Sequence, residues 1–397
     1  MSPATVPAFL GLALRDAFRP RVPAPPASPG TCARALAEAM AWLVRAHDAS
    51  GGRGVSKNYI LGRGWNHPYP ETTGYIIPTF LDWAARSGDA SFADRAAAMG
   101  GWEIEIQTPG GGIQQGMRTP REPLPPIAFN TGVVLKGFVR LHRHTGESRF
   151  LDAAVRAGDW LVEHLDADGA WRRGSYQGIP HTYHSRCAWS LLLLHEIAPD
   201  PRYRAAAARH LDWVVSTQAA NGFFPEARFF PGRLPNTHGL AYTHRGLLES
   251  HRLTGEPSWL EAAVRGAVPV RREIETRGRL YGIYDAAWRP ASRFDCLTAI
   301  AQHALVWYRL SDLEGREDWR APADRALDLL IALQDRTSGN GGVRGGIKGS
   351  HPVWGRYAPF QFPNWAAKFF ADALMLRHPA PPKHGGAGGE TGRGRAS

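Results

Sequence analysis

Two kinds of helical pattern alternate along the chain. In one kind, apolar residues recur at helical spacing on one face only, over residues 33–46, 92–106, 151–164, 205–218 and 323–333, with a less regular example near Val270. The other kind is apolar nearly all round and covers residues 75–85, 133–142, 188–197, 240–253, 299–310 and 365–376. Because a helix that is apolar on every side is buried, we expect the second kind to lie inside the first.

Each of the more apolar helices opens with a short polar signature, and the openings recur at intervals of 52 to 69 residues. The openings begin at Glu71, Asn130, His184, Asn236, Asp295 and Asn364. Self-similarity at such a period indicates stacked supersecondary units that share one core. We therefore predict an all-α domain, an (α/α)6 toroid of six helical hairpins, over residues 31–378.

The loops before and after the apolar helices differ in length. The segments that precede them are long, as in 108–129 and 339–362, whereas the turns that follow, such as 145–147 and 254–256, are short. Loops of that length in a compact domain are usually functional. Since every inner helix follows a long loop, all six inner N-termini should lie on one rim. Free N–H groups and partial positive charge would then suit that rim to an anionic ligand.

The two ends of the chain have a different composition from the rest. Residues 1–30 are rich in Pro and Ala, and residues 379–397 are Gly-rich and basic, so we expect both to be disordered. The sequence contains no run of about 18 apolar residues, so we expect no membrane span. The N-terminal apolar patch is too short for a signal peptide. Three widely separated cysteines favour free thiols in a reducing compartment, so we expect a cytoplasmic protein.

The chain is basic, with a formal net charge of +11 that comes mainly from arginine. A GC-rich coding sequence would explain part of the arginine content, and an acidic small molecule or polymer as partner would explain the rest. No basic run or nucleic-acid motif is present, so no nucleic-acid partner is expected. His181 and His184 lack cysteine partners at metal-ligand spacing, and segment 341–351 is not a P-loop. We predict no metal and no cofactor.

Acidic residues at the inner-helix openings form the first group of candidate catalytic residues. Glu71 and Asp295 each stand at an opening, and Asp285 and Glu226 lie in loops. Two facing carboxylates would meet the requirement for glycoside hydrolysis, in which one protonates the leaving oxygen and the other activates water or attacks. The structural alternative is that Glu71 complements the helix dipole and that Asp295 is an N-cap.

A second group contains the residue types needed for proton abstraction beside a uronate carboxylate. His184, His238 and Tyr242 are candidate catalytic residues, with Arg186 and Asn236 nearby to neutralise the carboxylate. His238 and Tyr242 are four positions apart and would share one helix face. The alternative is that these histidines are hydrogen-bonded core residues.

Further residues are candidates for substrate contacts. Aromatic rings in the loops can offer an apolar platform to a sugar face while keeping a polar edge, and the alternative is that they pack the loops onto the rim. The loop aromatics are Trp65, Tyr69, Trp171, Tyr176, Phe223, Phe224, Tyr284, Trp288, Trp354 and Tyr357. Those expected to bind substrate are Trp65, Tyr69, Tyr284 and Trp354, together with Asn130, Arg186, Asn236, Arg245, Asp285 and Lys348.

With its six hairpins and polar openings, the chain resembles the (α/α)6 toroid of the six-hairpin glycosidase superfamily. Similar toroids occur in polysaccharide lyases and in the C-terminal part of glucuronyl C5-epimerases. The resemblance implies a site on the rim where the inner helices begin, with aromatic residues in the loops. The sugar, its linkage and the oligomeric state have no signature in the sequence.

We therefore expect a carbohydrate-active enzyme whose partner is an anionic, uronic-acid-containing glycan. The richness in His, Tyr, Asn and Arg favours abstraction of the C5 proton, as in a lyase or an epimerase. One alternative is a glycoside hydrolase that uses Glu71 with Asp295 or Asp285. The other is a glycan-binding or scaffold toroid without catalysis.

Overall fold

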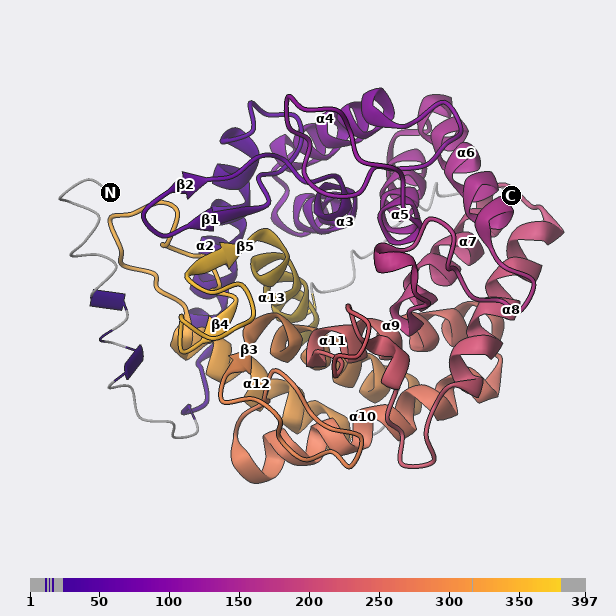
Figure 1. Ribbon diagram of the computed structural model, residues 1–397. Helices are drawn as coiled ribbons and strands as arrows, with labels where there is room; N and C mark the ends of the chain where they lie inside the picture. Colours follow the sequence, from indigo (N-terminus) through magenta and orange to yellow (C-terminus); the bar gives the residue numbers. More distant parts are fainter. Residues whose placement is uncertain (1–10, 13, 15, 18–23, 316, 380–397) are drawn as a thin grey trace, which may run out of the picture.

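The computed structural model describes residues 11–12, 14, 16–17, 24–315 and 317–379. Within these residues, twelve α-helices form two concentric rings (Figure 1). The outer ring consists of α2 (Pro29–Asp48), α4 (Ser91–Ile106), α6 (Ser148–His164), α8 (Pro201–Ser216), α10 (Pro257–Arg277) and α12 (Arg320–Leu333). The inner ring consists of α3 (Pro70–Ser87), α5 (Ala128–Thr145), α7 (Ser185–Ile197), α9 (Thr237–Thr254), α11 (Leu297–Glu314) and α13 (Asn364–Arg377). The predicted all-α toroid of six hairpins is confirmed.

The inner helices form a closed ring. Each of them packs on the next in chain order, and α13 contacts α3 to complete the circle. Two glycines in the first turns of inner helices, Gly74 in α3 and Gly132 in α5, make this packing possible. A Cβ atom on Gly74 would lie 2.6 Å from the Cα atom of Val134, and one on Gly132 would lie 2.6 Å from Sγ of Cys187. The glycine in these signatures therefore serves helix packing.

The threonines that directly precede these glycines, Thr73 and Thr131, also have a structural role. The Oγ1 atom of Thr73 accepts a hydrogen bond from the Val55 amide and donates one to the carbonyl oxygen of Tyr69. Thr131 repeats this arrangement in the next hairpin, with the Ile113 amide and the Ile127 carbonyl. These threonines tie each long loop to its inner helix.

Short strands, which the sequence pattern did not predict, pair the long loops at the rim. Strands β1 (Asn58–Ile60), β2 (Gly64–Trp65) and β5 (Gln361–Pro363) form an antiparallel sheet in the order β2-β1-β5. Strand β3 (Asp295–Cys296) pairs with β4 (Ser350–His351). Loop backbone groups need hydrogen-bond partners when they are covered, and distant loops supply them here. The pairing of β1 with β5 joins the loops of the first and last hairpins.

Part of the segment 1–30, which we expected to be disordered, packs against the toroid. The Asp16 carboxylate is 6% exposed and accepts hydrogen bonds from Lys348 and from the Val353 amide. The Ala27 amide donates to Asp328, and α2 already begins at Pro29. For the described residues of this segment, the ion pair of Asp16 with Lys348 is a contact that the Pro/Ala-rich composition did not indicate. The predicted tail, 379–397, lies outside the described residues except for Pro379.

The cysteines and the apolar character of the helices were also the subject of predictions from the sequence. Cys32, Cys187 and Cys296 are free and buried. None of the helices in the described ranges combines the length and apolar character needed to cross a bilayer.

Candidate functional site

A cavity of about 360 Å³ lies at the rim where the inner helices begin. Its wall comes from the first turns of α3, α5, α9 and α13, from the 3-10 turn η2 (Thr182–His184) before α7, and from the long loops. The wall residues are Lys57, Tyr69, Glu71, Gln115, Gly116, Ile127, Phe129, Asn130, Tyr176, Tyr183, Phe229, His238, Tyr242, Tyr357 and Trp365. The volume and the mixture of rings with few polar groups are typical of small-molecule sites.

Glu71 is the acidic group of this wall, at the second position of α3. Its Oε2 atom accepts a hydrogen bond from the Tyr69 hydroxyl. Burial raises the pKa of the Glu71 carboxyl, and the Tyr69 hydroxyl, Lys57 and Arg186 oppose that shift. The Lys57 ammonium lies 4.9 Å from the centroid of the Tyr69 ring. A carboxyl with a raised pKa keeps its proton to higher pH than an ordinary glutamic acid and can act as a proton donor.

No second carboxylate belongs to the described part of the cavity wall. Asp295 is buried and forms an ion pair of 2.6 Å with Arg279. Asp285 lies in a loop and pairs with Arg289 at 2.8 Å, and Glu226 pairs with Arg228 at 2.8 Å. The prediction that Glu71 faces Asp295 or Asp285 across the cavity is therefore wrong, because each aspartate is paired with an arginine outside the wall.

His238 and Tyr242 meet at the wall on one face of α9, as their spacing predicted. Their ring centroids are 4.4 Å apart, and the Arg186 guanidinium lies 5.0 Å from the Tyr242 ring. His238 Nδ1 is 2.8 Å from Oε1 of Gln302, so Nδ1 carries the proton and Nε2 keeps a lone pair. Burial lowers the pKa of His238 to about 3. The imidazole is therefore neutral and weakly basic.

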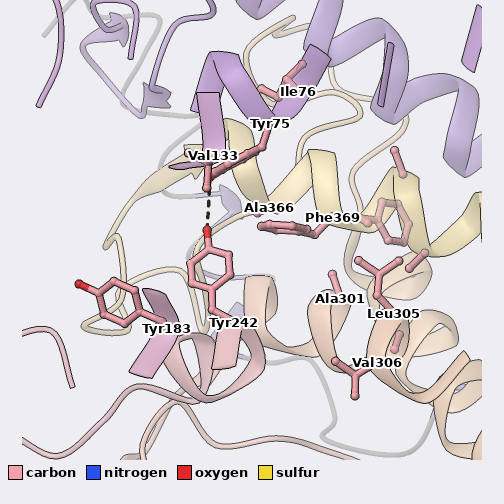
Figure 2. Close-up of a cluster of buried hydrophobic side chains, with 14 of the residues drawn as sticks. Tyr75, Ile76, Val133, Tyr183, Tyr242, Ala301, Leu305, Val306, Ala366 and Phe369 are labelled. Atoms are coloured by element: carbon pink, nitrogen blue, oxygen red, sulfur yellow. Dashed lines mark hydrogen bonds between the residues drawn. The ribbon is translucent and has the colours of Figure 1, made fainter. Parts of the chain in front are cut away.

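Tyr242 is part of an aromatic cluster between the cavity and the core. Figure 2 shows its hydroxyl pointing to Tyr75, to which it donates a hydrogen bond of 3.5 Å, with Phe369 and Tyr183 nearby. The centroid of the Phe129 ring lies 5.1 Å from those of both Tyr183 and Tyr242. Burial raises the pKa of Tyr242, so the phenol stays protonated and can donate a hydrogen bond. These rings give the cavity an apolar wall with hydroxyl edges.

Asn130 places an amide in the same wall. Its Nδ2 atom donates to the Gln114 carbonyl at 2.6 Å, and its Oδ1 atom is buried without a hydrogen-bond partner in the described residues. A buried acceptor without a partner is unfavourable, so a ligand hydroxyl would improve this site.

The structure thus brings five of the predicted site residues together, with two of the loop aromatics, and leaves others outside the wall. Glu71, Tyr69, Asn130, His238 and Tyr242 line the cavity, and so do Tyr176 and Tyr357. The remaining candidates lie elsewhere. They are Arg186, buried against the Tyr242 ring; His184, buried between Phe129 and Trp171; Trp65, packed on Trp42; Asn236, at the start of α9; Arg245, at the other end of the toroid; Tyr284, bonded to Glu273; and Trp354, exposed on a loop.

Lys348 requires a separate correction. We expected it to bind substrate, but its side chain is 3% exposed, and its ammonium pairs with Asp16 and hydrogen-bonds with His351. An anion cannot reach a side chain that is enclosed in this way.

The sequence did not identify eight of the wall residues, which are Lys57, Gln115, Gly116, Ile127, Phe129, Tyr183, Phe229 and Trp365. Lys57 illustrates why. Its amide donates to the His67 carbonyl, and its carbonyl accepts from the Asn364 amide, so pairing between distant loops places it on the rim. No local signal encodes that position. In the described residues, no group of three or more His, Cys, Asp or Glu side chains is placed to hold a metal ion.

Comparisons with known proteins bear on the fold. Neither a protein-family model nor a curated protein sequence matches the chain. Solved structures do match. An unsaturated glucuronyl hydrolase from Bacillus sp. GL1, described as responsible for glycosaminoglycan degradation, has a TM-score of 0.66 at 17% identity, covering 88% of this chain and 97% of that chain. A second such hydrolase, specific for heparin, has a TM-score of 0.68 at 15% identity over 88% and 97%.

A third similar structure is an unsaturated glucuronyl hydrolase variant from Streptococcus agalactiae in complex with dGlcA-GalNAc6S. Its TM-score is 0.67 at 12% identity, covering 92% of this chain and 94% of that chain. These enzymes are six-hairpin glycosidase-like (α/α)6 toroids, so the predicted resemblance is confirmed at the level of the fold.

Proposed function

We propose that this protein is a carbohydrate-active enzyme that hydrolyses an unsaturated glucuronyl residue from an anionic oligosaccharide, with Glu71 as its acid and base. The observation that carries the proposal is Glu71 itself. It is the carboxyl group among the described wall residues, its pKa is raised by burial, and it is hydrogen-bonded to Tyr69. The similarity to toroids named unsaturated glucuronyl hydrolases supports the substrate class.

One carboxyl is sufficient for this chemistry. An unsaturated uronide has a double bond between C4 and C5 next to the ring oxygen, which makes it an enol ether. The Glu71 carboxyl protonates C4, and the positive charge that develops is shared by C5 and the ring oxygen. Water then adds to C5 and returns a proton to the Glu71 carboxylate. The hemiketal formed at C5 opens the ring, and the hemiacetal left at C1 releases the rest of the glycan as an alcohol.

Other wall residues would position this substrate. Lys57 supplies a positive charge for the uronate carboxylate beside Glu71. The Asn130 amide oxygen can accept from a sugar hydroxyl, and the rings of Phe129 and Trp365 offer apolar faces.

The proposal is tested by ultraviolet absorbance with an unsaturated glucuronyl disaccharide. The conjugated double bond absorbs, so hydrolysis by the wild-type protein should make the signal fall. Glu71→Gln removes the transferable proton and should reduce kcat by about a hundredfold or more, the range expected for loss of a general acid. Asp285→Asn is the matched control, because its carboxylate pairs with Arg289 outside the cavity, and it should keep wild-type activity. A Glu71→Gln variant with near wild-type kcat would contradict the proposal. Binding without any change in absorbance would favour a glycan-binding toroid.

A second candidate is β-elimination, which the contact of His238 with Tyr242 beside Arg186 favours. In that reaction His238 would remove the C5 proton and Tyr242 would protonate the leaving oxygen. We place it second, because a histidine with a pKa of about 3 is a weak base at neutral pH. The same assay separates the two reactions. With saturated uronate polysaccharides, elimination would make the absorbance rise, and His238→Ala would abolish the rise.

A further inference from the structure

A second cavity, the basal cavity, lies at the opposite end of the toroid. It has a volume of about 640 Å³ and is lined by residues from beyond the middle of several inner helices, such as Ala85 on α3, Arg143 on α5, Arg252 on α9 and Met375 on α13. Its described lining contains eight basic and three acidic side chains. The rim cavity, by comparison, is lined by a single lysine and a single glutamate.

The three acidic side chains are already engaged by basic neighbours. Glu249 is buried, accepts a hydrogen bond of 2.6 Å from Arg252, forms an ion pair of 2.6 Å with Arg245, and lies 3.6 Å from Arg309. Asp372 pairs with Lys368, and Asp82 pairs with Arg140. With Glu196 paired to Arg143 and Asp312 near Arg309, the basic side chains of the lining that form no ion pair within the described residues are Lys136 and Arg86.

Lys136 is a buried basic residue of this lining that forms no ion pair within the described residues, and Asp372, itself paired with Lys368, is the carboxylate that acts on its charge. Lys136 is 8% exposed and lines the basal cavity, yet its ammonium has no hydrogen bond or ion pair within the described residues. Its contact there is the Trp189 ring, 4.2 Å from Nζ. The Nε and Nη1 atoms of Arg245 are also buried without hydrogen-bond partners. Buried cationic groups without partners are unfavourable, so these donors require an acceptor.

Helix dipoles do not account for this arrangement. Arg143 and Arg252 lie in the last turns of α5 and α9, where a basic side chain is favourable. Lys136 lies in the middle of α5, and Lys368 lies near the start of α13. Burial lowers the pKa of Lys136 well below its usual value, Arg186, Lys368 and Arg245 lower it further, and Asp372 opposes the shift. Positive charges gathered at such depth would be stabilised by a bound anion.

We propose that the basal cavity binds a small oxyanion, a phosphate or sulfate group, with Lys136 and Arg245 as its main donors. Arginine and lysine donors converging from different helices match the several acceptor oxygens of such a group. The group is either the free inorganic ion or a substituent on a sugar. The proposal does not depend on the function of the rim cavity.

The test is isothermal titration calorimetry of the full chain with inorganic phosphate and then sulfate, at constant ionic strength. We expect saturable binding, weakened at least about tenfold by Lys136→Met, because hydrogen bonds to charged groups have that magnitude. Lys57→Met is the matched control, since it removes a lysine from the rim cavity and should leave phosphate affinity unchanged. Glu71→Gln should also bind phosphate normally, which separates this test from that of the proposed hydrolase activity.

The source of the group is resolved by titrating glucose 6-phosphate with glucose as its control. Tighter binding than inorganic phosphate would identify a phosphorylated sugar as the ligand, and equal binding would identify the free ion. If Lys136→Met does not fold, Arg252→Gln at the same cavity replaces it and should also weaken binding. No saturable heat with phosphate or sulfate would overturn the proposal. So would a loss of affinity in Lys57→Met but not in the basal-cavity variants.

Discussion

Glu103 is a buried acid whose replacement has an effect that can be worked out from the structure. It lies on α4, is 0% exposed, and neither carboxyl oxygen has a hydrogen-bond partner in the described residues. Burial raises its pKa well above the model-peptide value of 4.5. The folded chain therefore keeps a proton that the unfolded chain releases. The contribution of this proton to the free energy of unfolding is fully present below the pKa that Glu103 has in the unfolded chain. It is lost, by about 1.4 kcal/mol per pH unit, as the pH rises toward the pKa in the folded chain.

Glu103→Met removes the carboxyl and keeps a side chain of similar length. The free energy of unfolding should increase by about 1–3 kcal/mol where the acid is protonated, and by more at higher pH. Glu105→Gln is the matched control, since that residue is exposed two positions along the same helix. Urea unfolding followed by tryptophan fluorescence at pH 5 and pH 8 measures the difference. The reasoning is refuted if wild type and Glu103→Met show the same pH dependence of unfolding.

Three further predictions concern packing, charge and catalysis. Glu249→Gln should lower the free energy of unfolding by about 3–5 kcal/mol, measured by urea denaturation, because it leaves three arginines without their shared carboxylate. Gly74→Ala should lower the melting temperature because its Cβ would strike Val134, whereas Gly101→Ala, with open space in α4, should raise stability by about 0.5–1 kcal/mol. In the hydrolase assay, kcat/KM should fall as pH rises through the raised pKa of Glu71, because protonated Glu71 is the proton donor. A fall centred at or below pH 4.5 would contradict that assignment.

The fold could be predicted from the sequence because each helix carries its own periodic signal. The polar openings also identified part of the cavity wall, since Glu71 and His238 stand in first turns and the ring brings first turns together. The contacts of residues in the long loops could not be predicted from such periodic patterns. Lys348 looked available for a ligand, but its partner Asp16 is 332 positions away in sequence. Asp295 matched Glu71 in repeat position, yet Arg279 neutralises it. Ion pairs between residues far apart in sequence produce no periodic pattern from which they could be predicted.

Closure of the inner ring has a consequence for how the chain unfolds. In an open repeat array, the end repeats have one neighbour each and can fray independently. Here α13 packs on α3, and β1 pairs with β5, so every inner helix has two neighbours. Loss of any hairpin would break two interfaces, and we expect the toroid to unfold as one cooperative unit. For the same reason, a circular permutant reopened at the exposed turn 254–256 should retain the ring, because no position in it is structurally first or last.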